Sequence, residues 1–558
     1  MRTHGKDRAA NIRRMKNEAQ AMPGHAGLYS PDVSSTASAS ARSAAPVTWH
    51  SDAIRIPAII TDALFVFLII VNVIRTLRHA MWRDELQDFM LALYSSSPWS
   101  LLSELKYMGH PGLWHMLVWV ITRFTSDPMW MQLLHIGLAI AVWLIIYWWS
   151  PFNRLEKILL LLSYFLFWEY FVISRSYVLI ALFTFAFIAL RERRPRPEFV
   201  LWLLLGLLAN VHVFGAIWSI VLASMLALQG MRLKSVSIAG AAVYIVLLVL
   251  AIVTMAPAAD EGLWGHDWPS VSRLYDDLVI PFGAYMPLKL DSIMEAVAFI
   301  AHPGSASVPQ FWSLNPTDFF VTLLHIDPLH PARLALVFAV PIIACWLITR
   351  DLMLLLEFAL VYLGIVLFAN IWGYPLAARH HGVIFLAFIA CAWAARLRQP
   401  AGRWSAWVLG SLLIINACGG VLTLASELKP FSEGYNTATW IEQTKLADSF
   451  LIGSNDAQVS TVAGYLGRPI YYLECECQGS FIVWNTKRLS PLSAEEFGNR
   501  LTKAVALART RDAILIRDQP INIADLTARA PNLSLQLLKS FTDAASDENF
   551  WIYRAELK

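Results

Sequence analysis

The sequence predicts an α-helical polytopic membrane protein with roughly 10–12 spans, followed by a C-terminal α/β domain. Hydrophobic residues make up 57% of the 558 residues and charged residues only 15%, whereas soluble domains carry about 25% charged residues. The mean hydropathy is +0.51. Long apolar runs end near residue 425, and short strand-like segments follow. These observations exclude an ordinary soluble protein.

The chain begins with a polar stretch over residues 1–54. Its Lys and Arg residues are concentrated before Glu18, and residues 34–46 are rich in Ser, Ala and Pro. This composition predicts a disordered cytoplasmic tail that leads into a signal-anchor helix without a cleavable signal.

The region 55–425 is expected to form the membrane core. About eleven runs are candidates for membrane spans, because a span needs about 20 apolar residues. Runs of that length lie at 57–76, 128–149, 236–255, 332–349, 352–370, 380–396 and 404–425, and shorter or interrupted runs lie at 110–124, 158–173, 177–190 and 199–229.

Basic residues in the short loops predict the orientation of these spans. The basic tail places the N-terminus inside, so residues 77–109 emerge outside. Arg191–Arg196, Arg232–Lys234, Arg350 and Arg396–Arg403 should all face the cytoplasm. If every candidate crosses, however, the loop Arg191–Arg196 falls outside. Either one piece between 110 and 190 does not cross, with 110–124 and 158–190 as suspects, or the rule fails at that loop.

Two soluble pieces are expected outside the cytoplasm. Residues 256–331 form a loop rich in Trp, Pro and acids, and residues 426–558 form the α/β domain. Phe450–Gly453, Ile470–Leu473, Ala513–Arg517 and Phe550–Arg554 have the composition of strands, and 493–509 has a helical pattern. Cys475 and Cys477 form a Cys-x-Cys pair, which is too little for a metal site without further ligands.

An acidic stretch, Trp82-Arg-Asp84-Glu85-Leu-Gln87-Asp88, follows the first apolar run directly. On a helix, Asp84, Gln87 and Asp88 share one face. Taken alone, this stretch resembles a solvated helix start, where acids are favoured by the helix dipole. Its position against a membrane surface also suits a carboxylate pair that faces a lipid-borne substrate. Asp88, one turn on, is expected to be the solvated end of this helix.

Two further motifs stand at expected span boundaries. His110-Pro111-Gly112-Leu-Trp114 opens the next segment and fits either an interfacial helix start or a binding site. Arg175, in Ser-Arg175-Ser-Tyr177, interrupts a long apolar stretch. An arginine at membrane depth costs about 2.5–3.5 kcal/mol, so it usually marks a function or an anionic partner. A phosphate headgroup is the natural ligand, because a guanidinium matches its oxygens.

Two further interruptions of the apolar runs carry histidines and complete the set of candidate site residues. His212, in Asn210-Val-His212-Val-Phe-Gly215, is an isolated imidazole that fits packing or ligand binding. Arg379-His380-His381 stands at the expected outer end of a helix and fits headgroup snorkelling or a second cationic site. One acidic cluster and several basic or imidazole groups therefore converge on the outer leaflet. That set suits transfer of a group from a lipid phosphate.

These motifs resemble the GT-C superfamily of membrane glycosyltransferases over roughly residues 55–400. Asp84-Glu85 after the first span, His110-Pro111 and the Arg175-x-Tyr177 break carry the resemblance. The superfamily includes protein O-mannosyltransferases, aminoarabinose transferases, and galacturonosyl- and mannosyltransferases of bacterial envelopes. Gly112 replaces the second proline of the family's His-Pro-Pro.

The resemblance implies an enzyme, a lipid-phosphosugar-dependent glycosyltransferase that acts on hexosyl or pentosyl donors. Asp84 would be the catalytic base, and Glu85 would assist through a divalent metal (Mg²⁺ or Mn²⁺) or hydrogen bonds. The substrate-binding residues would include His110, Arg175, Tyr177, His212, Arg379 and His380.

The same resemblance implies the partners and the location. The donor would be a polyprenyl-phosphate sugar, and the acceptor an envelope glycan, glycolipid or protein hydroxyl. The reaction would take place on the outer face of a bacterial inner membrane, with the N-terminus cytoplasmic and the C-terminal domain periplasmic or extracellular. No nucleic-acid partner is expected.

Two other functions remain open from the sequence. An O-antigen-type polymerase or ligase is also polytopic with outer-loop arginines, but lacks an acid pair directly after its first span. A transporter or flippase would carry paired polar residues at mid-membrane and inverted repeats. Neither is evident in the sequence, and a binding scaffold without catalysis also remains.

Overall fold

The computed structural model describes residues 57–233, 237–262, 331–374, 376–444, 446, 448–509 and 512–558. The expected tail 1–54, Lys234 and residues 263–330 of the expected outer loop lie outside the described residues. Seven described helices are long and apolar enough to cross a membrane, as expected of a multi-pass membrane protein. They are α2 (Ala58–Arg78), α6 (Met129–Trp149), α10 (Val213–Leu233), α11 (Ile238–Met255), α16 (Leu352–Trp372), α17 (Ala378–Arg398) and α18 (Arg403–Ser426).

Further helices complete the membrane bundle. They are α7 (Arg154–Leu161), η2 (Phe165–Glu169), α8 (Tyr177–Arg191), α9 (Glu198–Ala209) and α15 (Pro331–Thr349). The seven long runs in the sequence match α2, α6, α11, α15, α16, α17 and α18 to within two residues at each end. The run 199–229 is two helices, α9 and α10, because Asn210–His212 breaks it.

The helices run between two ends of the bundle. The Gln132 side chain near the start of α6 donates hydrogen bonds to the carbonyl oxygens of Thr76 (2.9 Å) and His79 (3.1 Å) at the end of α2. Helices α2 and α6 are therefore antiparallel neighbours. We call the end of the bundle that holds these contacts the site end, and the opposite end the basic end.

The short run 110–124 does not cross the bundle. It forms α5 (Leu113–Thr122), which has 10 residues and a length of about 15 Å, half the thickness of a bilayer core. Both of its ends lie at the site end: the Leu113 N–H donates to Asn210 O (3.0 Å), and the Arg123 side chain donates to Ala92 O (3.0 Å). This resolves the conflict in the expected orientation.

The basic loops gather at the basic end. Arg191 at the end of α8 pairs with Glu357 of α16 (2.9 Å), and Arg396 of α17 pairs with Glu156 of α7 (3.0 Å). Arg398 also binds Glu192 there (2.8 Å). With α5 removed from the count, Arg191–Arg196 falls on the same side as the loops at Arg350 and Arg396–Arg403, as the charge pattern requires.

The C-terminal domain is a sheet with helices. Its strands are β1 (Phe450–Ser454), β2 (Ile470–Tyr472), β3 (Cys477–Gly479), β4 (Ala513–Arg517), β5 (Leu533–Phe541) and β6 (Phe550–Leu557), in the order β3-β2-β1-β4-β6-β5. Its helices are α19 (Gly434–Gln443), α20 (Asp456–Leu466), α21 (Ala494–Ala508) and α22 (Ile523–Arg529). β1 is parallel to β2 and β4, and the other pairs are antiparallel. The four expected strands and the expected helix are all present.

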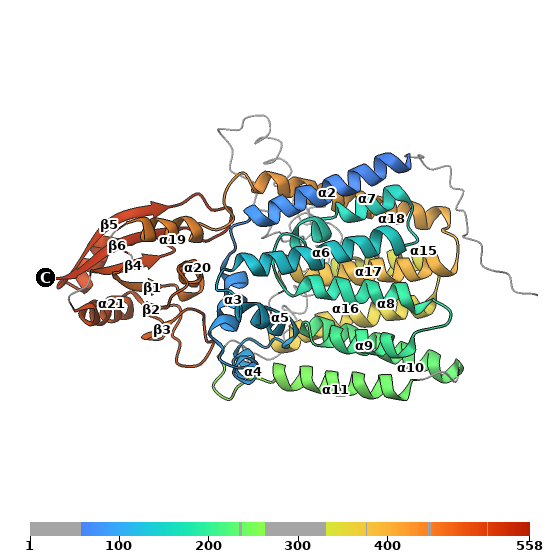
Figure 1. The fold of residues 1–558 in the computed structure, drawn as a ribbon, viewed down its shortest axis with the longest axis horizontal. Helices are drawn as coiled ribbons and strands as arrows, with labels where there is room; N and C mark the ends of the chain where they lie inside the picture. The colour runs from blue at the N-terminus through green and yellow to red at the C-terminus, as the bar shows by residue number, and fades with distance from the viewer. Residues whose placement is uncertain are drawn as a thin grey trace, which may run out of the picture. The chain divides into compact units, whose positions relative to one another are not determined.

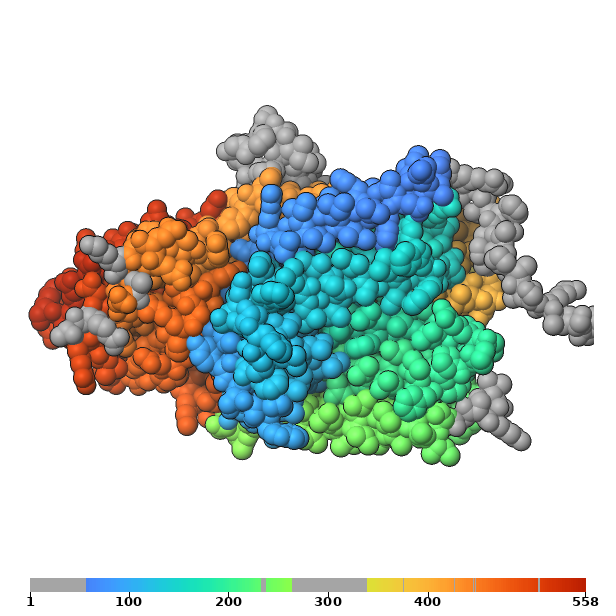
Figure 2. Space-filling model, viewed as in Figure 1, coloured from blue at the N-terminus to red at the C-terminus, as the bar shows by residue number. Residues whose placement is uncertain are grey.

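The C-terminal domain packs on the site end through α3 (Arg83–Tyr94), and α4 (Pro98–Glu104) and η1 (Leu105–Tyr107) lie nearby (Figure 1). The Gln87 side chain donates to Ile482 O and accepts from Ile482 N, both at 2.8 Å. The Arg83 N–H donates to the carboxylate of Glu548 (2.9 Å). In the space-filling view, the orange C-terminal domain lies directly against the blue N-terminal helices (Figure 2). The domain thereby becomes one wall of the site described next.

Candidate active site

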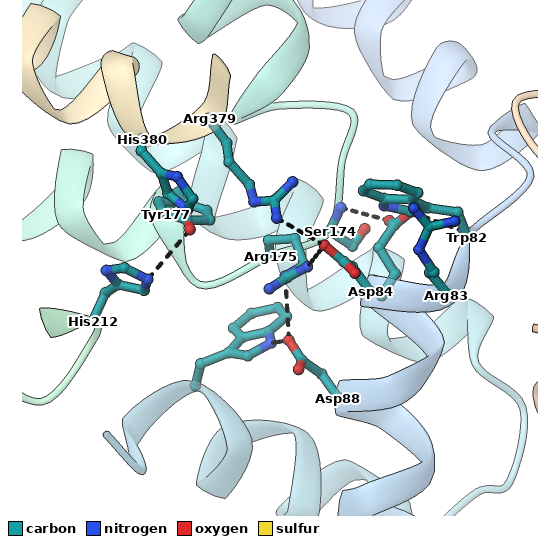
Figure 3. Close-up of polar contacts among 12 residues, drawn as sticks. Trp82, Arg83, Asp84, Asp88, Ser174, Arg175, Tyr177, His212, Arg379 and His380 are labelled. Atoms are coloured by element: carbon teal, nitrogen blue, oxygen red, sulfur yellow. Dashed lines mark hydrogen bonds and ion pairs between the residues drawn. The ribbon is translucent and has the colours of Figure 1, made fainter. Parts of the chain in front are cut away.

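Helix α3 presents the acidic stretch. It begins at Arg83 after Trp82, and the Glu85 carboxylate accepts from the Trp82 N–H (3.3 Å), which caps the helix start. Acids in a first turn are also favoured by the helix dipole. Asp84 and Asp88 are one turn apart and face the same way. Both therefore point toward the break that carries Arg175 (Figure 3).

Asp84 lies between two guanidinium groups. Its Oδ2 is 2.6 Å from Arg175 Nη1 and 3.3 Å from Arg379 Nη2. Burial alone would raise the pKa of Asp84, but the charges of Arg175, Arg379 and Arg83 outweigh it and hold the pKa well below its usual range. Asp84 is therefore ionised at neutral pH and is one-quarter exposed to the cavity.

Arg175 sits in the irregular segment between η2 and α8, where the helical hydrogen bonds are interrupted. Besides Asp84, its Nε is 3.5 Å from Asp88 Oδ2. The Nε atoms of the two guanidinium groups are less well used: Arg175 Nε, like Arg379 Nε, is buried without a hydrogen-bond partner among the described residues. Buried donors normally find acceptors, so these groups are available to an anionic ligand.

Asp88 is not the solvated helix end that was expected. Its side chain is 3% exposed and accepts a hydrogen bond from Trp114 Nε1 (3.0 Å). It also lies 3.1 Å from His115 Nε2. Burial would raise its pKa, yet the charges of His115 and Arg175 lower it. The expectation failed because the partners on α5 fold back onto α3 and exclude water. Asp88 is an anchor that ties α3, α5 and Arg175 together.

Glu85 faces away from Asp84, contrary to the expectation of a shared role. Its carboxylate is fully buried and binds His79 Nε2 (2.9 Å) and the Ser174 N–H (2.6 Å). One helix residue separates the two acids by about 100°, so they cannot both face the cavity. Glu85 instead fixes the backbone next to Arg175, and we assign it a positioning role.

The divalent metal expected at Asp84 and Glu85 does not fit these positions. The two carboxylates diverge, and Asp84 Oδ2 lies against the guanidinium groups of Arg175 and Arg379, which repel a cation. Within the described ranges, no group of three or more His, Cys, Asp or Glu side chains is placed to hold a metal ion. The chemistry proposed below therefore uses no metal.

The remaining expected site residues form a second layer. Tyr177 Oη is 3.3 Å from His212 Nε2, and the ring centroid of His380 is 5.9 Å from that of Tyr177. Tyr374 Oη lies 3.2 Å from His380 Nε2. His110 stands beside His212, with ring centroids 5.2 Å apart. Burial, together with the positive groups around it, lowers the pKa of His110, so its imidazole is neutral at pH 7.

These groups line a cavity of about 340 Å³. All the expected substrate-binding residues except His212 border it, and His212 lies behind Tyr177. The residues that the sequence did not suggest are Arg83, Gln87, Met108, Gly373, Tyr374, Ala457, Ile482 and Trp484. The last three come from the C-terminal domain. No local signal marks them, although Gln87 does share the helix face of Asp84.

The arrangement combines a carboxylate, two arginines with unused donors and a ring of neutral hydrogen-bonding side chains. Such a cavity can bind a phosphate beside a base. The arginines neutralise the phosphate charge through forked hydrogen bonds. Tyrosine hydroxyls and neutral imidazoles can donate to or accept from sugar hydroxyls.

No protein-family model matches the chain, and no curated protein matches it by sequence. Among solved structures, the crystal structure of ArnT from Cupriavidus metallidurans bound to undecaprenyl phosphate is similar at 15% identity and a TM-score of 0.40. The alignment covers 89% of this chain and 97% of that chain. At this level of similarity we draw no conclusion about activity, and the function is inferred from the side chains described above.

Proposed function

We propose that the protein is a membrane glycosyltransferase that moves a sugar from a polyprenyl-phosphate carrier to an acceptor hydroxyl. The observation that carries the proposal is the placement of Asp84 between Arg175 and Arg379 in one cavity. The resemblance of the sequence motifs to GT-C enzymes points to the same chemistry. The acceptor class, an envelope glycan, glycolipid or protein, is set by the surfaces around this cavity.

In this proposal the arginines bind the carrier phosphate and Asp84 acts as the base. The acceptor oxygen attacks the anomeric carbon of the sugar while its proton passes to the Asp84 carboxylate. The bond between that carbon and the phosphate oxygen breaks, and its electron pair leaves with the phosphate. Arg175 and Arg379 stabilise the added negative charge. A single displacement of this kind inverts the anomeric centre.

Donor binding also prepares Asp84 for this role. Without donor, the two arginines hold the pKa of Asp84 low, which makes it a weak base. A bound phosphate draws the guanidinium groups toward its own oxygens, so their attraction on Asp84 weakens and its pKa rises. A base works best when its pKa approaches the working pH. The carboxylate thus becomes effective only when the donor is present.

We place the site outside the cytoplasm. The loops at Arg191–Arg196 and Arg396–Arg403 lie at the basic end, which belongs inside by the distribution of positive charge. The site end and the C-terminal domain are then extracytoplasmic, where nucleotide sugars are absent. The disulfide between Cys475 and Cys477 in this domain suits an oxidising compartment. A bacterial inner membrane is the setting that fits these features.

A panel assay tests the proposal. Purified protein is offered radiolabelled polyprenyl-phosphate sugars, and transfer to envelope extract is scored for the wild type and for Asp84→Asn. Loss of the base should lower turnover about 10²–10⁴-fold, or roughly 3–5 kcal/mol. Asp62→Asn is the matched control, because Asp62 is an exposed carboxylate of α2 bonded to Tyr147 near the basic end.

Two outcomes would contradict the proposal. Asp84→Asn could transfer sugar at nearly the normal rate, which would remove the base from the mechanism. Alternatively, the wild type could bind polyprenyl phosphate without transferring any sugar of the panel, which would favour a transporter or scaffold.

A further inference from the structure

A second cavity lies at the site end, outside the catalytic one. It measures about 310 Å³ and is formed between the end of α2, Trp168 of η2 and residues 427–431, which link α18 to the C-terminal domain. We call residues 427–431 the linker. No part of the proposed transfer chemistry uses this cavity.

The walls of the second cavity are strongly basic. Arg75, Arg78 and Lys429 line it together with a single carboxylate, that of Glu427. Glu427 is already neutralised, because its Oε1 is 2.6 Å from Arg75 Nε. Arg75 in turn is fully engaged, since it also donates to Asn72, Phe167 O and Thr423. The excess positive charge therefore belongs to Arg78 and Lys429.

Those two side chains are free to bind an anion. Arg78 is exposed and makes no ion pair or side-chain hydrogen bond with any residue in the described part of the chain. Within the described ranges, Lys429 pairs only with Asp543 (2.8 Å), which is 67% exposed. An exposed pair of this kind contributes about 0–1 kcal/mol, so a bound phosphate can displace it at little cost.

The surroundings of the cavity are apolar on the membrane side. Ile74 and Leu428 line it and are 46% and 67% exposed, and Leu77 of α2 beside them is also exposed. Within its membrane-spanning window, only 28% of α2 is buried inside the protein, so this helix faces lipid. A ligand here meets cations at the headgroup level and apolar side chains below them.

We propose that the second cavity binds the phosphate headgroup of an anionic phospholipid of the surrounding bilayer. The headgroup would bridge Arg78 on α2 and Lys429 on the linker, and the acyl chains would lie along Ile74 and Leu77. Because the linker leads directly into the C-terminal domain, the bound lipid would hold that domain against the bundle. The proposal does not depend on the transferase chemistry.

The lipid would also support the wall of the active site. His79 lines the second cavity and binds Glu85, which in turn accepts from the Ser174 N–H beside Arg175. A small cavity of about 20 Å³ lies between Trp168, Phe431 and Arg379, so it borders both larger cavities. It has room for about one water molecule.

Thermal unfolding of the purified full-length protein in detergent tests the site. The protein is titrated with dihexanoyl phosphatidic acid, with dihexanoyl phosphatidylcholine, and with inorganic phosphate. A ligand that binds the folded state raises the melting temperature. The phosphatidic acid should do so at concentrations well below those of the other two, because it alone offers both a phosphate with a free anionic charge and acyl chains.

Variants locate the effect. Arg78→Gln with Lys429→Gln should raise the half-maximal phosphatidic acid concentration about tenfold or more, since each base near a membrane surface attracts anionic lipid. Lys106→Gln with Lys487→Gln removes the same charge elsewhere at the site end and should change nothing. Arg379→Gln should also leave the effect in place, which separates this site from the catalytic cavity.

Each remaining outcome decides against the proposal. Equal responses to phosphatidic acid and inorganic phosphate would mean that the site takes free phosphate rather than lipid. An unchanged response in the Arg78/Lys429 variant would show that these two residues do not bind the lipid. Loss of the response in Arg379→Gln would place the lipid in the catalytic cavity. Failure of sugar transfer in the panel assay would leave all of these results intact.

Discussion

Asp88→Asn distinguishes the buried anchor seen here from a solvated helix end. The Asp88 carboxylate accepts from Trp114 Nε1 at 3.0 Å, and lies 3.1 Å from His115 Nε2 and 3.5 Å from Arg175 Nε. Asparagine keeps one acceptor oxygen and loses the charge. Hydrogen bonds to charged groups are worth about 1.5–3 kcal/mol each, and breaking a buried pair costs about 3–5 kcal/mol. We expect a loss of stability of about 2–4 kcal/mol on the basis of these two estimates.

The assay is unfolding by SDS titration in mixed micelles, with Asp62→Asn as the exposed control. The pH dependence gives a second check. The pKa of Asp88 is lowered in the folded state. The contribution of Asp88 to stability is therefore complete above the unfolded pKa of about 3.9, and it is lost as the pH falls through the lower folded pKa. The difference between wild type and Asp88→Asn should therefore shrink in acid. Equal stability of the two at neutral pH, with normal sugar transfer, would refute the anchor.

Three further predictions concern the donor site, the domain contact and the topology. Arg175→Lys should weaken binding of polyprenyl phosphate about 10-fold or more, because an ammonium lacks the fork; unchanged equilibrium binding would contradict the assignment. Burial raises the pKa of Glu548 to about 7, so its protonated form favours folding and stability falls as pH rises from about 4 to 7. Glu548→Gln should flatten that slope and raise the free energy of unfolding by up to about 3 kcal/mol at pH 8. Parallel pH profiles of unfolding for the wild type and the variant would refute this. A cysteine replacing exposed Glu495, in a background without Cys475 and Cys477, should react with an impermeant thiol reagent in intact cells; protection until lysis would overturn the orientation.

The membrane helices could be predicted from the sequence because a long apolar run in such a hydrophobic chain has few possible structures other than a membrane-spanning helix. Hydropathy alone could not show that 110–124 lies at one end, since a short apolar helix looks the same whether it crosses or not. The Leu-rich strand β5 has few of the residues that favour strands, and its pairing with β6 decides its conformation. It was therefore not expected.

The charged residues of the candidate site could be predicted from the sequence, but the residues that they contact could not. Asp84, Arg175 and Arg379 stand out because charge is scarce in this chain, and they do meet. Asp88 looked solvated because its partners lie 26 and 27 residues away. The contact of Gln87 with Ile482 joins residues 395 positions apart. Such contacts depend on how the helices and the C-terminal domain pack, which no local pattern reveals.

The wall that the C-terminal domain supplies to the catalytic cavity has an evolutionary consequence. Ile482 and Trp484 come from a segment after β3 that is far in sequence from the arginines. Under the proposed function, changes there would alter the wall that an acceptor meets without disturbing Arg175 and Arg379, which would hold the donor. If the protein transfers sugar as proposed, a lineage can therefore acquire a new acceptor by varying one peripheral loop. For the same reason, a chimera that exchanges residues 480–488 between related enzymes is the natural starting point for redirecting the sugar.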